Sequence, residues 1–348
     1  MNILLVLTGG TICTSVRGGL RALDTDGASL RLLTTFRESA SPFAHSTRFH
    51  IGAQFHTLSE NMTVDVWNKI AAYLRTVDFS AFDGIIIAHG TDTLAYTASM
   101  FAFLLAGTRR PVMLVSSNAP LERGDALENG DANFRAAVEC IAYGVPPGVW
   151  VPYRNPTDRR MFLHMGARLK QCADYSEDFH SVGALDITEL SPDTLSALSG
   201  VQTPGMPLLS AFDAPLSDCV LLLRPYVGAR YDAYRTECFK AVLHGTYHSG
   251  TTCVGDGASD VSSVLYLLER CAGTDTDLYL SPAWDEGELY DTVPAMLRRR
   301  PDGRRIIPLH GTTEEAAYCK LLLWHSWENL RERVPDFLSC NFCGESIE

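Results

Sequence analysis

The chain alternates between short, fully apolar runs and longer segments in which apolar residues recur every three or four positions. Apolar runs occupy Ile3–Leu7, Gly84–Ala88 and Pro111–Val115. Short apolar runs without polar alternation are typical of strands covered on both faces of a parallel sheet. The segment that begins at Thr63 instead follows the helical period, through Val64, Trp67, Ile70, Ala71 and Leu74. Such strands alternating with helices predict an α/β fold.

The same alternation resumes after a stretch rich in Pro and Ser, which predicts a second domain. Further strands are expected within 219–226, 239–245, 278–280 and 306–309, and helices over 260–271 and from Thr313. The domains that we expect are a larger N-terminal α/β domain with a parallel or mixed sheet over 1–195, a linker over 196–215, a smaller C-terminal α/β domain over 216–335 and a tail over 336–348.

Composition and charge argue against some classes of function. The 348 residues are 46% apolar and 20% charged, as in ordinary soluble proteins. A net charge of −12 argues against nucleic acid as a partner, because binding to phosphates needs clustered Lys and Arg. The opening apolar run is too short for a signal peptide and no run is long enough to span a membrane, so no membrane partner is expected. Ten scattered cysteines are typical of a cytoplasmic protein.

A metal or another cofactor is not expected. Cys340 and Cys343 form a lone CxxC, and a zinc site would need two further ligands at suitable spacing. His244 and His248 have the spacing of the two histidines of a zinc protease, but the glutamate of that motif is missing.

Three loops carry the candidate chemistry. The first apolar run ends in TGGT (residues 8–11), the second is followed by HGTDT (89–93), and SENM (59–62) precedes the Thr63 helix. Ligands of parallel sheets bind beyond the carboxyl ends of the strands, and glycines there allow close approach of the backbone. Threonine hydroxyls are potential nucleophiles but also good helix caps, so either role is open from the residues alone. A phosphate cradle is disfavoured, because neither GxGxxG nor a Walker lysine follows.

In order and spacing, TGGTI, SENM and AHGTDT resemble the bacterial-type L-asparaginase family, in its type I-like, cytoplasmic form. The resemblance extends over nearly the whole chain, including a Rossmann-like C-terminal domain. It implies hydrolysis of L-asparagine to L-aspartate and ammonia by a threonine nucleophile. It also implies a homodimer or homotetramer that acts on a small amino-acid substrate.

The resemblance implies roles for individual residues. Thr11 would attack the amide carbon, and Thr91 would form a second centre that activates water. Asp92 would bind the substrate α-ammonium and support Thr91. Lys170, which precedes Phe179 by the family's nine positions, would serve Thr91. A lysine does this only where burial or a neighbouring charge lowers its pKa, and a solvated surface lysine is the alternative.

The remaining implied contacts bind the substrate. Ser59 would hold the α-carboxylate and Glu60 would lie beside the α-amino group, while Gly10 and Gly90 would offer backbone N–H groups. A neighbouring subunit would complete the site through the loop 245–249, in which His248 and Ser249 are the candidate contacts.

One position departs from the family pattern. A tyrosine is expected on a mobile loop shortly after TGGTI, but residues 13–23 contain none. Thr14, Ser15 or Arg17 are possible replacements, and Gly18-Gly19 would provide a hinge for a lid. Two alternatives therefore stay open. One is a related amidase that acts on glutamine, a D-amino acid or a larger amide such as a peptide or charged tRNA. The other is a sensor that binds asparagine or aspartate without turnover.

Overall fold

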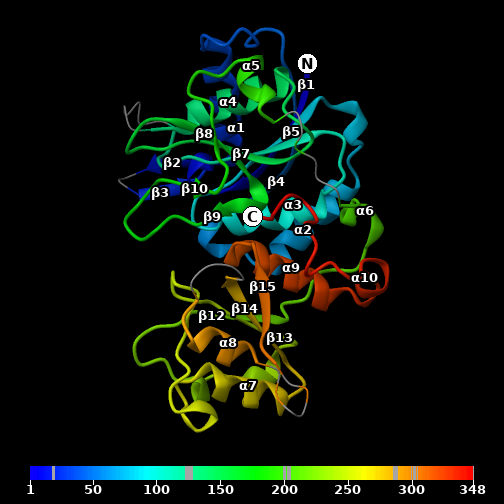
Figure 1. The fold of residues 1–348 in the computed structure, drawn as a ribbon. Coiled ribbons are helices and arrows are strands. Elements are labelled where there is room, and N and C mark those ends of the chain that lie inside the picture. Colours follow the sequence, from blue (N-terminus) through cyan, green and yellow to red (C-terminus); the bar gives the residue numbers. More distant parts are fainter. Residues whose placement is uncertain are drawn as a thin grey trace. The chain divides into compact units, whose positions relative to one another are not determined.

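The computed structural model describes residues 1–17, 20–121, 128–198, 201, 205–284, 289–298, 300, 303 and 305–347. The chain forms two compact units (Figure 1). One contains Met1–Asp213 together with Phe342–Gly344, and the other contains Ala214–Asn341 with Glu345–Glu348. The expected α/β class is confirmed in both units. No helix in these ranges is long and apolar enough to cross a membrane.

A seven-stranded mixed sheet forms the centre of the N-terminal unit. Its strands, in spatial order, are β11 (Leu185–Asp186), β8 (Met161–Met165), β7 (Gly148–Arg154), β6 (Pro111–Val115), β5 (Gly84–Ala88), β1 (Asn2–Gly9) and β4 (Arg48–Thr57). The strands from β4 to β7 are parallel, and β8 and β11 run antiparallel to their neighbours. β5 and β6 are buried along their whole length, as their apolar sequences predict.

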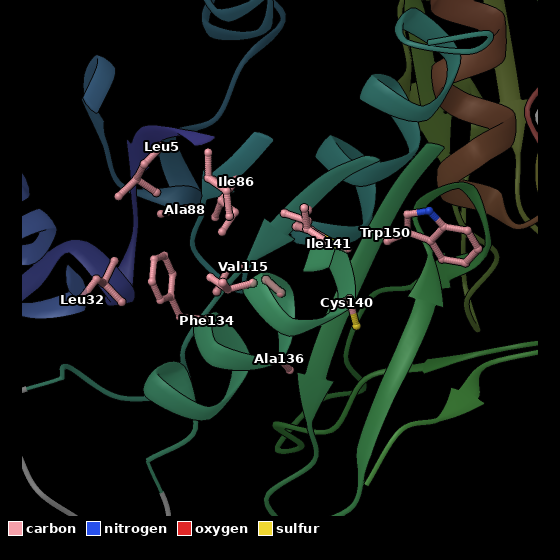
Figure 2. Packing of buried hydrophobic residues seen from close by; sticks show 14 of the residues in the cluster. Leu5, Leu32, Ile86, Ala88, Val115, Phe134, Ala136, Cys140, Ile141 and Trp150 are labelled. Atoms are coloured by element: carbon pink, nitrogen blue, oxygen red, sulfur yellow. The ribbon is translucent and has the colours of Figure 1, made fainter. Parts of the chain in front are cut away.

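Helices cover both faces of this sheet (Figure 1). They are α1 (Thr25–Glu38), α2 (Val64–Arg75), α3 (Leu94–Leu104) and α4 (Gly130–Ala142). α1 and α4 lie on one face, where Leu32 and Phe134 pack with Ile86 and Val115 of the sheet (Figure 2). On the other face, the Trp67 indole of α2 donates a hydrogen bond to a threonine of α3. As the sequence predicts, the Thr63 side chain caps α2.

Shorter elements complete the N-terminal unit. They are β2 (Thr14–Arg17), β3 (Leu20–Leu23), β9 (Leu169–Lys170), β10 (His180–Ser181), α5 (Pro192–Ser196) and α6 (Leu208–Ala211). β2 and β3 pair antiparallel, and so do β9 and β10. The stretch 196–215, expected to be a linker, thus begins at the last residue of α5 and contains one short helix, α6. Gly18 and Gly19, the expected hinge of a lid, lie outside the described residues.

The C-terminal unit is built on a four-stranded parallel sheet in the order β12 (Val220–Leu223), β13 (Ala241–His244), β14 (Asp277–Ala283) and β15 (Ile307–His310). Its helices are α7 (Val264–Ala272), α8 (Thr292–Leu297), α9 (Glu314–Ser326) and α10 (Glu328–Arg333). α7 begins later than expected, because the Asp260 carboxylate accepts the Ser262 N–H in a turn and Ser263 is the cap. In the expected tail, Glu345 is buried against Lys320 at 2.6 Å.

Single turns of 3₁₀ helix occur at Thr11–Cys13, Ser59–Asn61, Phe79–Ala81, Gly166–Arg168, Tyr231–Ala233, Thr236–Cys238 and Gly257–Ser259. The first two lie at the carboxyl ends of β1 and β4. The order of the parallel strands places β1 between β4 and β5, so the chain leaves β1 toward one side and later returns to its other side. Such a reversal is where open α/β sheets bind ligands. The fold thus directs attention to the ends of β1 and β5.

Candidate active site

Two glycines bring the first and second motifs into contact. A Cβ atom added to Gly10 would lie 2.1 Å from the Gly90 Cα, far inside the ordinary carbon contact distance. A Cβ on Gly90 would lie 2.4 Å from the Ser59 Oγ and 2.8 Å from the Gly10 Cα. The backbones of TGGT and HGTDT therefore pack directly on each other, and Ser59 of the SENM loop packs against Gly90.

The turn after β1 also needs glycine for its backbone angles. Gly9 has a φ of 126° and Gly10 a φ of 74°, both in the region that L side chains avoid. The Gly10 N–H donates to the Thr57 carbonyl at 3.1 Å, which ties the turn to the end of β4. Because of this turn, the side chains of Thr8 and Thr11 lie in different surroundings. The buried Thr8 hydroxyl donates to the Ala88 carbonyl at 2.9 Å, whereas Thr11 lines a cavity.

This cavity has a volume of about 380 Å³. Five predicted site residues line it, namely Thr11, Ser59, Glu60, Thr91 and Asp92. The Ser59 hydroxyl donates to the Asp92 carboxylate at 2.9 Å, and the Thr93 hydroxyl donates to the Ser59 carbonyl at 2.8 Å. The SENM and HGTDT loops are thus joined by two hydrogen bonds, with a carboxylate and two threonines facing one space.

His89 supports the second motif from inside. It is fully buried, and burial lowers its pKa to about 4, so the ring is neutral at neutral pH. A neutral ring that lies 2.7 Å from the Gly90 carbonyl through Nδ1 donates its proton there. His89 is therefore a packed histidine at the end of β5.

Among the predicted catalytic residues, Lys170 is the one that does not line the cavity. Its side chain is exposed, and it pairs with His180 between β9 and β10. The next residue, Gln171, lines the cavity instead and donates from Nε2 to the Thr91 carbonyl at 2.9 Å. Phe179, the aromatic partner in the motif, is buried against Tyr153, with ring centres 4.8 Å apart.

Apart from Leu58, which precedes Ser59, five cavity residues were not singled out in the sequence, namely Asn118, Gln171, Cys172, Ser176 and Glu177. Asn118 had a signal, because it follows the third apolar run and so lies at the same edge of the sheet. Its Oδ1 accepts the Asn129 N–H at 3.2 Å, and its Nδ2 donates to Glu177 at 2.9 Å. The others come from an irregular segment that no sequence pattern singles out.

The thiol in this cavity is not poised as a nucleophile. Burial raises the pKa of Cys172 to about 12, with nearby carboxylates adding to the effect. The group therefore stays protonated at neutral pH, and a thiol attacks only as thiolate. The hydroxyls of Thr11 and Thr91 are the better candidates.

The candidates to replace the missing tyrosine differ in their surroundings. The buried Thr14 lines the cavity, and its hydroxyl donates to the Thr11 carbonyl at 2.8 Å. Ser15 is buried and does not line the cavity. The side chain of Arg17 lies outside the described part of the molecule. Thr14 is thus the neighbour in contact with Thr11.

The loop 245–249 belongs to the C-terminal unit, where it follows β13. His248 is exposed, and the Ser249 hydroxyl lies 2.9 Å from that of Thr251. Both ring nitrogens of the buried His244 have protein partners, the Tyr231 hydroxyl and the Gly245 carbonyl. His244 therefore has no nitrogen left for a metal.

Comparisons with known proteins show what this chain is similar to. The family model described as "Asparaginase, N-terminal" matches residues 2–196. The glutamyl-tRNA(Gln) amidotransferase of Saccharolobus solfataricus has a subunit, designated D, that is 27% identical, over 99% of this chain and 76% of the relative. The corresponding subunit of Sulfolobus acidocaldarius is 24% identical, over 99% and 75%.

Two solved structures share the fold. The thermostable L-asparaginase of Thermococcus kodakarensis superposes with a TM-score of 0.69 at 22% identity and covers 99% of both chains. L-asparaginase I of Vibrio cholerae gives a TM-score of 0.69 at 21% identity, over 99% of this chain and 98% of the other. The family model matches more than half of the residues of this chain, and the matched range includes the TGGT, SENM and HGTDT loops. The chain therefore belongs to the asparaginase family.

Proposed function

We propose that the protein hydrolyses the side-chain amide of L-asparagine to L-aspartate and ammonia, with Thr11 as the nucleophile. The observation that carries this proposal is the packing of Gly10 on Gly90, which presents Thr11 and Thr91 to one cavity beside the Ser59–Asp92 hydrogen bond. The family supplies the reaction class, cleavage of an amide. The cavity supplies the residues that would perform it.

The cavity offers complementary groups for a free amino acid. The Asp92 and Glu60 carboxylates would bind the α-ammonium group. The Ser59 hydroxyl, once its proton turns from Asp92 to the substrate, and backbone N–H groups of the Gly90 turn would bind the α-carboxylate, whereas the Gly10 N–H is already bonded to the Thr57 carbonyl. With both ends of the amino acid held, the side-chain amide would lie between the two threonines, where further backbone N–H groups can stabilise an oxyanion.

The chemistry would proceed in two steps. In the first, the Thr11 oxygen bonds to the amide carbon, the carbon–nitrogen bond breaks, and the hydroxyl proton leaves with the nitrogen as ammonia. In the second, water held at Thr91 adds its oxygen to the acyl carbon, the bond between that carbon and the Thr11 oxygen breaks, and a proton of the water returns to Thr11. Lys170 is proposed to aid proton transfer at Thr91, for which its exposed side chain must turn toward the cavity when substrate binds.

The test is ammonia release from the purified protein with L-asparagine and L-glutamine over a wide concentration range. Thr11→Val should lower kcat by at least about a thousandfold, because valine has no hydroxyl and the covalent step cannot take place without the nucleophile. Thr8→Val is the matched control, since it removes the neighbouring hydroxyl, which donates to the Ala88 carbonyl and does not line the cavity. Equal turnover of the two variants would refute the role of Thr11.

The names of the curated relatives support a second candidate, the supply of ammonia as a subunit of a glutamyl-tRNA(Gln) amidotransferase. The net charge of −12 opposes direct binding of tRNA by this chain. Release of ammonia mainly from L-asparagine would support the first candidate. Release mainly from L-glutamine would support the second.

We also propose that a second copy of the chain completes the site through His248 and Ser249. The loops after β12, β13 and β14 carry exposed Tyr226, Tyr247 and Trp284 at the same edge of a parallel sheet. Neighbouring exposed aromatics are typical of protein interfaces. Light scattering should show an oligomer. Val227→Glu, at a position 98% exposed, should weaken the oligomer and lower kcat together, and a monomeric wild type with full turnover would refute this proposal.

A further inference from the structure

We infer that Gln171 is a positioning residue for Thr91 and thereby sets the rate of the proposed reaction. Its side-chain amide makes two hydrogen bonds to the turn that carries HGTDT. Nε2 donates to the Thr91 carbonyl at 2.9 Å, and Oε1 accepts the Ala95 N–H at 3.4 Å. This role rests on the proposed function, because it concerns the geometry of that reaction.

The second hydrogen bond replaces a missing helix cap. Thr93 is the N-cap residue of α3, but its side chain caps no N–H of the helix. The Thr93 hydroxyl is used elsewhere, since it donates to the Ser59 carbonyl at 2.8 Å. The N–H of the buried Ala95 is one of the first-turn donors that a helix cannot satisfy itself. Gln171, 76 positions later in the chain, accepts it.

The two hydrogen bonds together explain why the residue is a glutamine. A single side chain must donate to one backbone group and accept from another, and an amide can do both. The Thr91 carbonyl also accepts the Leu94 N–H at 3.2 Å, so its position is shared between the helix and Gln171. Holding this carbonyl and Ala95 together fixes the turn that presents the Thr91 hydroxyl and the Asp92 carboxylate to the cavity.

Two substitutions separate positioning from mere support of the fold. Gln171→Leu removes both hydrogen bonds. Gln171→Glu keeps an acceptor for the Ala95 N–H, where a negative charge at the helix N-terminus is favourable. An ionised glutamate has no proton to donate to the Thr91 carbonyl, whereas a protonated one does. Only Gln171→Glu should therefore regain the hydrogen bond as the pH falls toward the carboxyl pKa.

The experiment measures kcat and KM for L-asparagine from pH 5 to pH 8.5 in wild type and both variants. Gln171→Leu should lower kcat about ten- to a hundredfold, since a small misplacement of reacting groups has effects of this size. KM should change much less. The ratio of kcat for Gln171→Glu to that of wild type should rise as the pH falls, while the Gln171→Leu ratio stays constant.

Ser191→Ala is the control for loss of a helix cap, because Ser191 caps α5 in the same unit and does not line the cavity. It should lower stability without changing kcat. Wild-type kcat in both Gln171 variants, or a flat ratio for Gln171→Glu, would overturn the inference and leave the proposed function intact. A wild type that releases no ammonia from any amide would refute the proposed function, and this inference with it.

Discussion

Replacement of Gly10 by alanine tests whether the contact between the two motifs builds the site. Gly10 has a φ of 74° and a ψ of −173°, a combination that is essentially confined to glycine. Forcing alanine into it costs about 1–3 kcal/mol. The added Cβ would also lie 2.1 Å from the Gly90 Cα, so the two backbones must separate by more than about 1 Å to reach a normal contact.

The two effects together predict a measurable but tolerable loss of stability. Overpacking costs about 1–3 kcal/mol, so the free energy of unfolding should fall by about 2–6 kcal/mol in total. A domain of ordinary stability, about 5–15 kcal/mol, survives most of that range at 25 °C. Turnover should fall at least about a hundredfold, because a shift of about 1 Å between reacting groups has effects of this size.

Gly144→Ala is the matched control. Gly144 has a φ of 83°, but a Cβ there meets nothing within 4 Å. This variant should lose about 1–2 kcal/mol from its backbone angle and keep wild-type turnover. The assays are urea unfolding and ammonia release from L-asparagine. If Gly10→Ala kept turnover within about threefold of Gly144→Ala, a difference well below the expected effect, the contact would not build the site.

Two further predictions follow from the site and the core. Lys170→Ala should lower kcat more than about tenfold with KM little changed, as expected for loss of a proton acceptor, and wild-type kcat in this variant would remove Lys170 from the mechanism. His89 and His244 are buried, and burial lowers the pKa of each to about 4 from an ordinary value near 6.5. The unfolded chain therefore binds more protons between these values, and the free energy of unfolding should fall as the pH drops from about 6.5 to 4, by up to about 3 kcal/mol for each histidine. Urea midpoints measured over this range check the prediction, and a midpoint independent of pH would contradict it.

The sequence determined the parts of the site that follow from strand order. TGGT and HGTDT each come directly after a fully apolar run, and such runs become parallel strands whose carboxyl ends share one edge. The glycines of both motifs predicted a close approach of the backbone at this edge. In the structure, the backbones at Gly10 and Gly90 are in contact with each other. Asn118 could have been found by the same rule.

Only the tertiary structure decided which side chain of the 170–177 segment faces Thr91. The motif pointed to Lys170, but β9 has two residues, and so short a strand carries no alternating pattern that would fix its faces. Gln171 makes hydrogen bonds to Thr91 and Ala95, which are far from it in the sequence. The bond to Ala95 is available because the Thr93 side chain does not cap α3. The sequence by itself thus determined the α/β class and the two threonine motifs, because both depend on local apolar patterns and glycines. The cavity wall depended on long-range hydrogen bonds, which local patterns do not encode.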